Sequence, residues 1–155
     1  TTSLRYFTVY GPGQRPDMLT HRLIAAAHNG SPVRIFGTGN QVRDFTFVGD
    51  VARANVAAIT ADTSPGQVFN IAGGSAVSIK EMIESVEAAV GLGQRIQQIT
   101  APPVSGDVPR TDASASLAES ILGWRPAVEL NEGISAQVDD YRSTHAQLPR
   151  YAMSA

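Results

Sequence analysis

The segment 4-LRYFTVYGPG-13 decides the fold class. Its first seven residues are rich in β-branched and aromatic side chains, and its last three are turn formers, so a strand that runs into a loop is expected. Apolar residues then recur at helical spacing over 19–27 until Asn29-Gly30, which is typical of a left-handed helix C-cap. Residues 33–36 form the next strand candidate, so a helix lies between two strands.

The same alternation continues along the chain. Residues 43–48 alternate like a strand, and Asp50 is expected to cap the helix that follows. Residues 68–71 are again strand-like, and the pair Ser78 and Glu81 forms the capping box of a further helix. The remaining candidates are a strand at 95–99, a Pro/Gly loop at 101–107, a short helix around Leu117 and Ile121 that Gly123 stops, and a last helix striped by Ile134, Val138 and Tyr141.

Short strands that alternate with helices predict an α/β layer architecture. At 155 residues the chain is expected to form one domain over 1–150, followed by a tail at 151–155. No apolar run approaches the ~20 residues that a membrane span needs, so no membrane partner is expected. A net charge of −2 with scattered arginines argues against nucleic-acid binding.

The absence of cysteine excludes disulfides, thiolate metal sites and cysteine nucleophiles, and it fits a reducing cytoplasm. The first residues show neither an initiating Met nor a signal peptide, and they look like the inside of a longer protein.

Motifs of a self-sufficient enzyme are also absent. Gly37-Thr38-Gly39 follows a strand candidate, but Val42 replaces the third glycine of a dinucleotide-binding loop, and a strand rather than a helix follows. Ala76 lies four residues before Lys80, the only lysine, so no Tyr-x-x-x-Lys pair exists. His21, His28 and His145 lack acidic or histidine partners at i+3 or i+4, so we interpret them as surface residues and expect no metal site.

Four ordered motifs resemble the extended short-chain dehydrogenase/reductases. They are RYFTVYGP followed by QRPDM over 5–18, IFGTGNQVRDF over 35–45, FNIAGG over 69–74, and GDVP through LGWRP over 106–126. Each alone would fit a turn or a helix stop, but their shared order over most of the chain is hard to explain that way. The chain resembles the NAD-dependent epimerase/dehydratase family, and UDP-glucuronate 4-epimerases most closely.

The resemblance places this chain in the C-terminal, sugar-nucleotide-binding half of such an enzyme, with the strand near 3–10 as the last strand of the Rossmann half. It implies that the backbone at Phe7 touches the nicotinamide region of NAD. It also implies that Thr8 and Arg15 contact the sugar. A threonine at position 8, where many relatives have asparagine, favours a glucuronate, whose carboxylate suits a hydroxyl donor and a guanidinium.

The resemblance further assigns the nucleotide contacts. The main chain at Arg34 and Phe36 would bind the uracil, with Gln41 adding a contact. Arg43 would pair with the diphosphate, and Asp107 would accept hydrogen bonds from the ribose hydroxyls. Many relatives have a second diphosphate arginine three residues before that aspartate. This chain has Val104 there, and Arg110 is the candidate replacement.

The implied function is binding of the UDP-sugar of an NAD-dependent 4-epimerase that converts UDP-glucuronate to UDP-galacturonate. The catalytic tyrosine and lysine and the NAD glycine loop would belong to the missing N-terminal Rossmann half, and the intact enzyme is expected to be a homodimer. UDP-glucuronate decarboxylation, NDP-sugar dehydration, a non-catalytic UDP-sugar-binding module and a purely structural domain remain alternatives.

Overall fold

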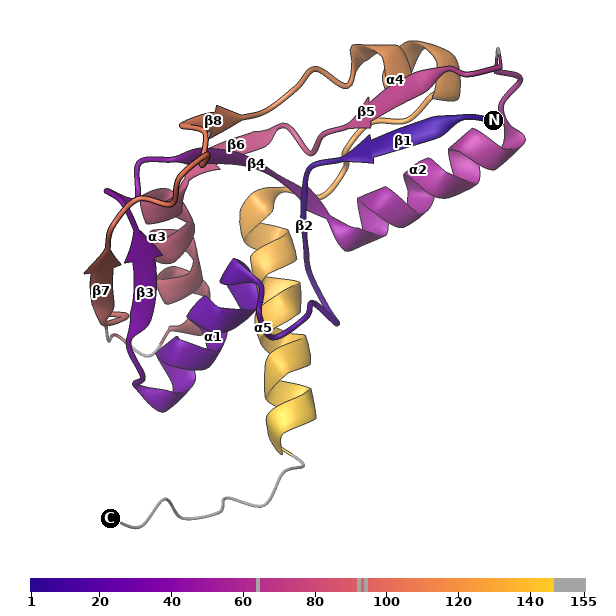
Figure 1. The fold of residues 1–155 in the computed structure, drawn as a ribbon. Coiled ribbons are helices and arrows are strands. Elements are labelled where there is room, and N and C mark those ends of the chain that lie inside the picture. The colour runs from indigo at the N-terminus through magenta and orange to yellow at the C-terminus, as the bar shows by residue number, and fades with distance from the viewer. Residues whose placement is uncertain (64, 92, 94, 147–155) are drawn as a thin grey trace.

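A computed structural model describes residues 1–63, 65–91, 93 and 95–146 (Figure 1). The elements follow in the order β1 (Ser3–Tyr6), β2 (Thr8–Tyr10), α1 (Leu19–Asn29), β3 (Val33–Phe36), β4 (Val42–Phe47), α2 (Val48–Thr60), β5 (Val68–Ile71), β6 (Ser75–Ser78), α3 (Ile79–Val90), β7 (Gln98–Ala101), β8 (Arg110–Thr111), α4 (Ser116–Leu122) and α5 (Leu130–Ala146). The expected tail at 151–155 lies outside the described residues.

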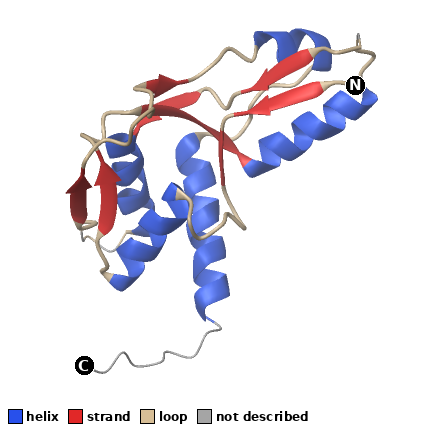
Figure 2. Cartoon of the chain, viewed as in Figure 1, coloured by secondary structure: helices blue, strands red, loops and turns tan. Residues whose placement is uncertain are grey.

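Three small sheets replace one continuous sheet (Figure 2). β1 pairs with β5, β3 pairs with β7, and β4 lies between β2 and β6 with β8 added alongside β4. All these pairs are parallel except that of β4 with β6. The alternation of parallel strands with helices confirms the α/β class.

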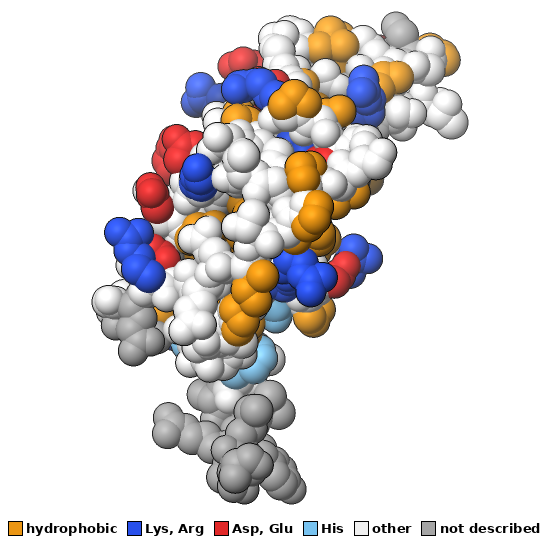
Figure 3. Space-filling model, turned by 60° about the vertical axis from the view of Figure 1, so that its left-hand side comes forward, with side chains coloured by type: hydrophobic (Ala, Val, Ile, Leu, Met, Phe, Trp, Pro, Cys, Tyr) orange, Lys and Arg blue, Asp and Glu red, His pale blue; other side chains and the backbone are white. Residues whose placement is uncertain are grey.

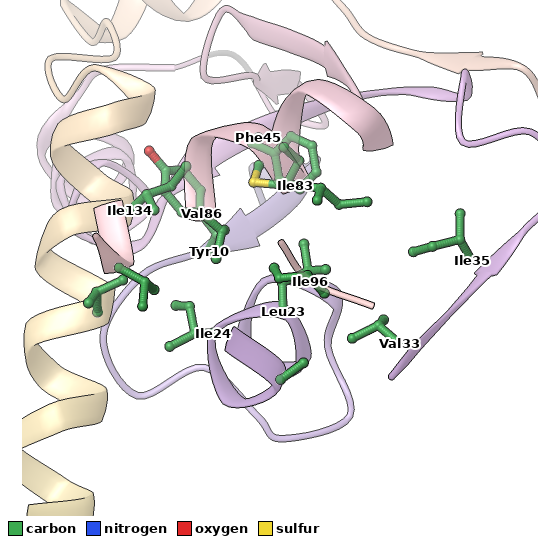
Figure 4. Packing of buried hydrophobic residues seen from close by; sticks show 14 residues of the cluster. Tyr10, Leu23, Ile24, Val33, Ile35, Phe45, Ile83, Val86, Ile96 and Ile134 are labelled. Carbon is green, nitrogen blue, oxygen red and sulfur yellow. The ribbon is translucent and has the colours of Figure 1, made fainter. Parts of the chain in front are cut away.

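Two hydrophobic clusters hold these layers together. The larger one joins β2, β3 and β4 to α1, α3 and α5, and Figure 4 shows Tyr10, Leu23 and Ile134 converging in it. The smaller one joins β5 to α2 and α4 around Phe69 and Trp124. Burying each large apolar side chain contributes roughly 1.5–3 kcal/mol, so these clusters position the loops between them.

The single strand expected over the first motif is wrong in one respect, because the chain changes sheets at Phe7. β1 pairs with β5 as far as Tyr6, whereas β2 starts its pairing with β4 at Thr8. The strand expected at 95–99 begins later, as β7, and β6 and β8 were not predicted. Each of these strands is short, and its pairing is set by contacts distant in sequence.

The helix ends agree better with the sequence. Ser78 and Glu81 form the predicted capping box, and Gly30 and Gly91 end α1 and α3 in the left-handed conformation. Asp50, however, does not cap α2. The helix starts at Val48, and the buried Asp50 carboxylate instead accepts hydrogen bonds from the backbone of the 127–128 segment.

Gly73 lies where β4 leaves no room for a side chain. A Cβ atom at this position would meet the carbonyl oxygen of Phe45 at 2.2 Å and the Cα of Thr46 at 2.8 Å. We expect Gly73→Ala to lower the free energy of unfolding by about 2 kcal/mol, because a packed backbone must shift. Chemical denaturation measures this loss. Ser75→Ala adds no atom, and we expect it to change stability by less than about 0.5 kcal/mol; equal stability of both variants would contradict the clash.

Candidate functional site

A cavity of about 340 Å³ opens between the starts of α1 and β2, the end of β3, and β4. Six of the residues singled out in the sequence line it, namely Thr8, Arg34, Phe36, Gln41, Arg43 and Asp107. Because these residues come from segments distant in the sequence, the fold brings together what the motifs only suggested.

The turn from β3 to β4 shapes one wall of the cavity. Gly37 and Gly39 have φ angles of 65° and 74°, which only glycine adopts readily. Within this turn the Gln41 amide donates to the carbonyl of Phe36 over 2.8 Å. The Gln41 Oε1 atom is buried and has no partner among the described residues. An unpaired buried acceptor beside an exposed strand end is a feature that a ligand donor would satisfy.

Arg43 and Asp107 form an ion pair across the cavity. The Arg43 side chain is only 17% exposed, and it also donates to the carbonyls of Val108 at 2.8 Å and Val42 at 2.7 Å. Two residues assigned to different parts of a nucleotide therefore lie against each other. The arginine is already oriented by fixed acceptors before any ligand arrives.

Asp44 follows Arg43 but points to the other face of β4, where it is buried. Its carboxylate accepts a hydrogen bond from the Gly73 amide at 2.7 Å. Burial raises the pKa of Asp44 above its usual value, although hydrogen bonds from the Gly73 and Gly74 amides oppose the shift. Asp44 thus fixes the glycine turn behind the cavity rather than facing a ligand.

The N-terminus of α1 forms the opposite wall, and the sequence reading missed its role. Met18 at the N-cap makes no side-chain cap, and the first turn holds no acidic residue. Thr20 is fully buried and lines the cavity, yet its Oγ1 has no partner among the described residues. Arg22 also lines the cavity and forms no ion pair within the part of the chain that the structure describes. Within the described chain the amides of Leu19 and Thr20 have no partner, and with the Thr20 hydroxyl and the Arg22 cation they favour an anion.

No sequence signal singled out Thr20 or Arg22, because helical periodicity shows which face is apolar but not which neighbour faces a cavity. The absence of an acid in the first turn, just after the QRPDM loop, is the one local hint.

Thr8 and Arg15 line different hollows. Arg15 belongs to residues 11–17, which we call the substrate loop after the sugar contact that the resemblance implies for Arg15, whereas Thr8 lines the larger cavity. Arg15 makes an exposed ion pair with Asp17 at 3.2 Å and lines a second hollow, of about 280 Å³, with Val48. This hollow shares Gln14 and Met18 with the larger cavity.

Phe7 and Arg110 lie outside the cavity lining. Phe7 is half-buried at the break between β1 and β2. Arg110 pairs with Asp112 at 2.7 Å, and that guanidinium lowers the pKa of Asp112. In the β4–β8 register Arg110 lies opposite Val42, one residue out of step with Arg43. The two arginines therefore project to opposite faces, and the diphosphate role of Arg110 stays a prediction without support from this placement.

The three histidines gather instead of standing apart. Tyr141 of α5 stacks on His145 with ring centroids 3.8 Å apart, and His21 and His28 lie within 5.5 Å and 5.1 Å of the same ring. Among the described residues, no group of three or more His, Cys, Asp or Glu side chains is placed to hold a metal ion. No helix of the described structure is long and apolar enough to cross a membrane. On the face shown in Figure 3, basic side chains are interspersed with acidic and apolar ones.

Known proteins are similar to this chain in both sequence and fold. Residues 1–72 match the NAD dependent epimerase/dehydratase family. The probable UDP-glucuronate 4-epimerase of Rhizobium meliloti (strain 1021) is 37% identical over 94% of this chain and 48% of its own length. The UDP-glucuronate 4-epimerase of Thermodesulfobacterium geofontis (strain OPF15) is 36% identical over 88% of this chain and 41% of its length.

Solved structures agree with these relatives. MoeE5 in complex with UDP-glucuronic acid and NAD superimposes with a TM-score of 0.86 at 42% identity, over 92% of this chain and 47% of its own. The UDP-glucuronic acid 4-epimerase from Bacillus cereus, with UDP-glucuronic acid and NAD, gives a TM-score of 0.85 at 39% identity, over 91% and 45%. The chain spans about half the length of the relatives it matches. The chain is thus similar to the NAD dependent epimerase/dehydratase family over residues 1–72, and to about half of each UDP-glucuronate 4-epimerase over most of its own length.

Proposed function

We propose that this chain binds the UDP-sugar substrate of an NAD-dependent nucleotide-sugar 4-epimerase, with UDP-glucuronate as the sugar nucleotide. The observation that carries the proposal is the cavity itself, which combines cationic, hydroxyl and unpaired amide groups. Solved relatives that superimpose on the chain contain UDP-glucuronic acid and NAD, which supports the same ligand class here.

The nucleotide would lie along the β3 to β4 side of the cavity. Arg34 and Phe36 are exposed residues of β3, and their main chain together with the unpaired Gln41 Oε1 would offer both donors and acceptors to a uracil edge. Asp107 suits ribose hydroxyls because an ionised carboxylate only accepts. A diphosphate between Arg43 and the α1 N-terminus would meet the guanidinium and the free helix amides together.

The sugar would extend past Thr8 toward the hollow that Arg15 lines. A glucuronate carboxylate arriving there would replace Asp17 as the partner of Arg15. This exchange is inexpensive, because an exposed ion pair such as Arg15–Asp17, with side chains 75% and 69% exposed, is worth at most about 1 kcal/mol. Specificity for an acidic sugar would then come from the Arg15 guanidinium, whose ion pair with Asp17 in the free protein is weak.

NAD would contact this chain at Phe7, between β1 and β2. Phe7 lies between the β1 and β2 registers, where the chain changes sheets, and this position suits a cofactor contact. Bound NAD supplies hydride acceptance and return at the sugar C4. Here the residues of the chain bind and orient the UDP-sugar beside that contact.

The Rossmann half that completes such an enzyme would cover β1 and α2. β1 pairs only with β5 among the described strands, so one of its edges is open. Large apolar side chains are exposed on and beside these elements, including Val56 at 62% and Ile59 at 83%. An open parallel edge flanked by apolar surface is unusual for a free surface and suits a covering α/β layer. Homodimerisation of the complete enzyme stays a prediction.

Arg15→Ala tests the sugar assignment. We expect the dissociation constant for UDP-glucuronate to rise roughly tenfold, the lower end expected for a charged hydrogen bond, while UDP-glucose binding changes by less than about twofold. Isothermal titration of the chain with both ligands measures this difference. Thr8→Val should shift the ratio in the same direction.

Arg95→Ala is the matched control, because Arg95 is an exposed arginine that pairs with Glu87 away from the cavity. Equal losses for the two sugar nucleotides in Arg15→Ala, or none for either, would refute the carboxylate contact. Failure of the wild-type chain to bind UDP would refute the nucleotide site as a whole.

A further inference from the structure

A pair of side-chain amides, Gln137 and Gln14, connects the substrate loop to the C-terminal helix α5. Gln137 of α5 is only 3% exposed, and its Oε1 accepts a hydrogen bond from the Gly11 amide at 3.1 Å. Its Nε2 donates to the Oε1 of Gln14 in the loop at 2.9 Å. A polar side chain buried this deeply, with both ends bonded to one loop, fixes where that loop lies.

Gln14 extends this hydrogen-bond network to β2 and to the first turn of α1. Its Nε2 donates to the carbonyl of Val9 at 2.9 Å, and its Oε1 also accepts from the amide of His21 at 3.0 Å. The Gln14 side chain therefore bonds the end of β2, the first turn of α1 and α5 at once. Gln14 lines both the large cavity and the Arg15 hollow.

Only one orientation of the two amides satisfies every bond. The backbone N–H groups of Gly11 and His21 only donate, and the carbonyl of Val9 only accepts. Rotating the amide of Gln14 or Gln137 by half a turn would place a donor against a donor or an acceptor against an acceptor. The network thus has a single bonded state, and the loop has a single matching position.

A second attachment lies one turn further along α5. The Asp140 carboxylate accepts a hydrogen bond from the Gly13 amide at 3.0 Å on the exposed side of the loop. The Arg15 guanidinium, by contrast, has hydrogen-bond partners among the described residues only at the nearby Asp17 and Met18. The location of its guanidinium therefore depends on the loop backbone that Gln137 and Asp140 hold.

We propose that Gln137 is a positioning residue for sugar specificity, which sets the place of Arg15 by anchoring the substrate loop to α5. The inference rests on the proposed function, because it presumes that the loop faces a UDP-sugar. The α1 wall is less dependent on this anchor, since buried Leu23 and Ile24 hold the helix in the larger cluster. Loss of the anchor should therefore disturb the sugar contacts more than the nucleotide contacts.

The test compares the wild-type chain with Gln137→Met, which keeps the length of the side chain but removes both polar atoms. Isothermal titration gives dissociation constants for UDP, UDP-glucose and UDP-glucuronate. We expect UDP binding to change by less than about twofold, and the preference for UDP-glucuronate over UDP-glucose to fall roughly tenfold, as after loss of one charged hydrogen bond. Amide hydrogen exchange at Gly11 should accelerate in the same variant without ligand.

Two adjacent aspartates allow a second test, which remains valid if Gln137→Met fails to fold. Asp140→Ala removes the bond to Gly13 and should shift the same preference in the same direction by a smaller factor. Asp139→Ala removes the same charge from a side chain that is 77% exposed and that pairs, among the described residues, with Arg142 alone, so the preference should not change.

Three outcomes would overturn the inference. Equal loss of affinity for all three ligands in Gln137→Met would show a purely structural role. An unchanged preference in both Gln137→Met and Asp140→Ala would show that the anchor does not act on the sugar. If the wild-type chain binds UDP but does not prefer UDP-glucuronate, there is no sugar specificity for Gln137 to control, although the nucleotide site stands. If the wild-type chain binds no UDP, the proposed function itself is refuted.

Discussion

Purified as the 155-residue chain, this protein is expected to show no NAD-dependent epimerisation of UDP-glucuronate. We base this expectation on two motifs, one for proton removal and one for holding NAD, that its sequence lacks. No tyrosine stands four residues before Lys80, and the Gly37-Thr38-Gly39 turn leads into β4 rather than into a helix that would receive a pyrophosphate. Because enzymes accelerate reactions by at least about a millionfold, turnover should fall to the uncatalysed level.

The tyrosines of the described chain do not offer a substitute base. Tyr10 is buried and donates to the carbonyl of Leu130. Burial raises the pKa of Tyr10 above its usual value, which disfavours a phenolate. Tyr6 lies in β1 and donates to Asn55 of α2, and Tyr141 packs among the histidines of α1 and α5. Tyr151 lies outside the described residues.

Chromatographic separation of UDP-glucuronate from UDP-galacturonate measures this expectation. The full-length Thermodesulfobacterium geofontis relative, assayed in parallel with NAD, is the positive control. Steady conversion by a preparation of the chain that is free of any longer enzyme would overturn it.

Arg43→Ala should weaken UDP binding by about 1.5–3 kcal/mol, which corresponds to a rise in the dissociation constant of roughly ten- to a hundredfold. The guanidinium is held at the cavity by Asp107 and two carbonyls, so little ordering is needed when a diphosphate binds. Uridine lacks phosphates, and its binding should change far less.

Arg43→Lys separates charge from geometry. A lysine keeps the positive charge but not the planar fork of donors, so UDP affinity should lie between those of the wild type and Arg43→Ala. Equal losses for UDP and uridine in Arg43→Ala would show instead that Arg43 only keeps Asp107 in place for the ribose. Titration of both ligands against all three proteins distinguishes these cases.

Helix positions were predictable because their signals are local. Ser78 and Glu81 satisfy each other's backbone groups within one turn, and Gly30 ends α1 by its own conformational freedom. Asp50 shows the limit of such reasoning. Its sequence position suits a cap, but distant amides of the 127–128 segment bind its carboxylate in the folded chain.

Part of the cavity lining could be predicted from motifs that have family counterparts, whereas other residues around the cavity gave no signal in the sequence. Arg43 and Asp107 lie 64 positions apart, and the resemblance assigned both before the fold joined them. Thr20, Arg22 and Gln137 gave no such signal, since each is an ordinary residue within an amphipathic helix. Their contacts with the cavity or with the 11–17 loop depend on tertiary structure, which helical periodicity does not encode.

The single tryptophan allows the unfolding of one hydrophobic cluster to be followed separately from the other. Trp124 lies in the smaller cluster, and its indole donates to the carbonyl of Asp50 at 2.9 Å, whereas the cavity proposed to bind the nucleotide is built on the larger cluster. Its fluorescence emission therefore reports the α2, α4 and β5 layer alone, while far-ultraviolet circular dichroism weights the helices of both clusters. The two signals will melt together only when the layers unfold as one cooperative unit, so their divergence in a variant marks which layer has loosened.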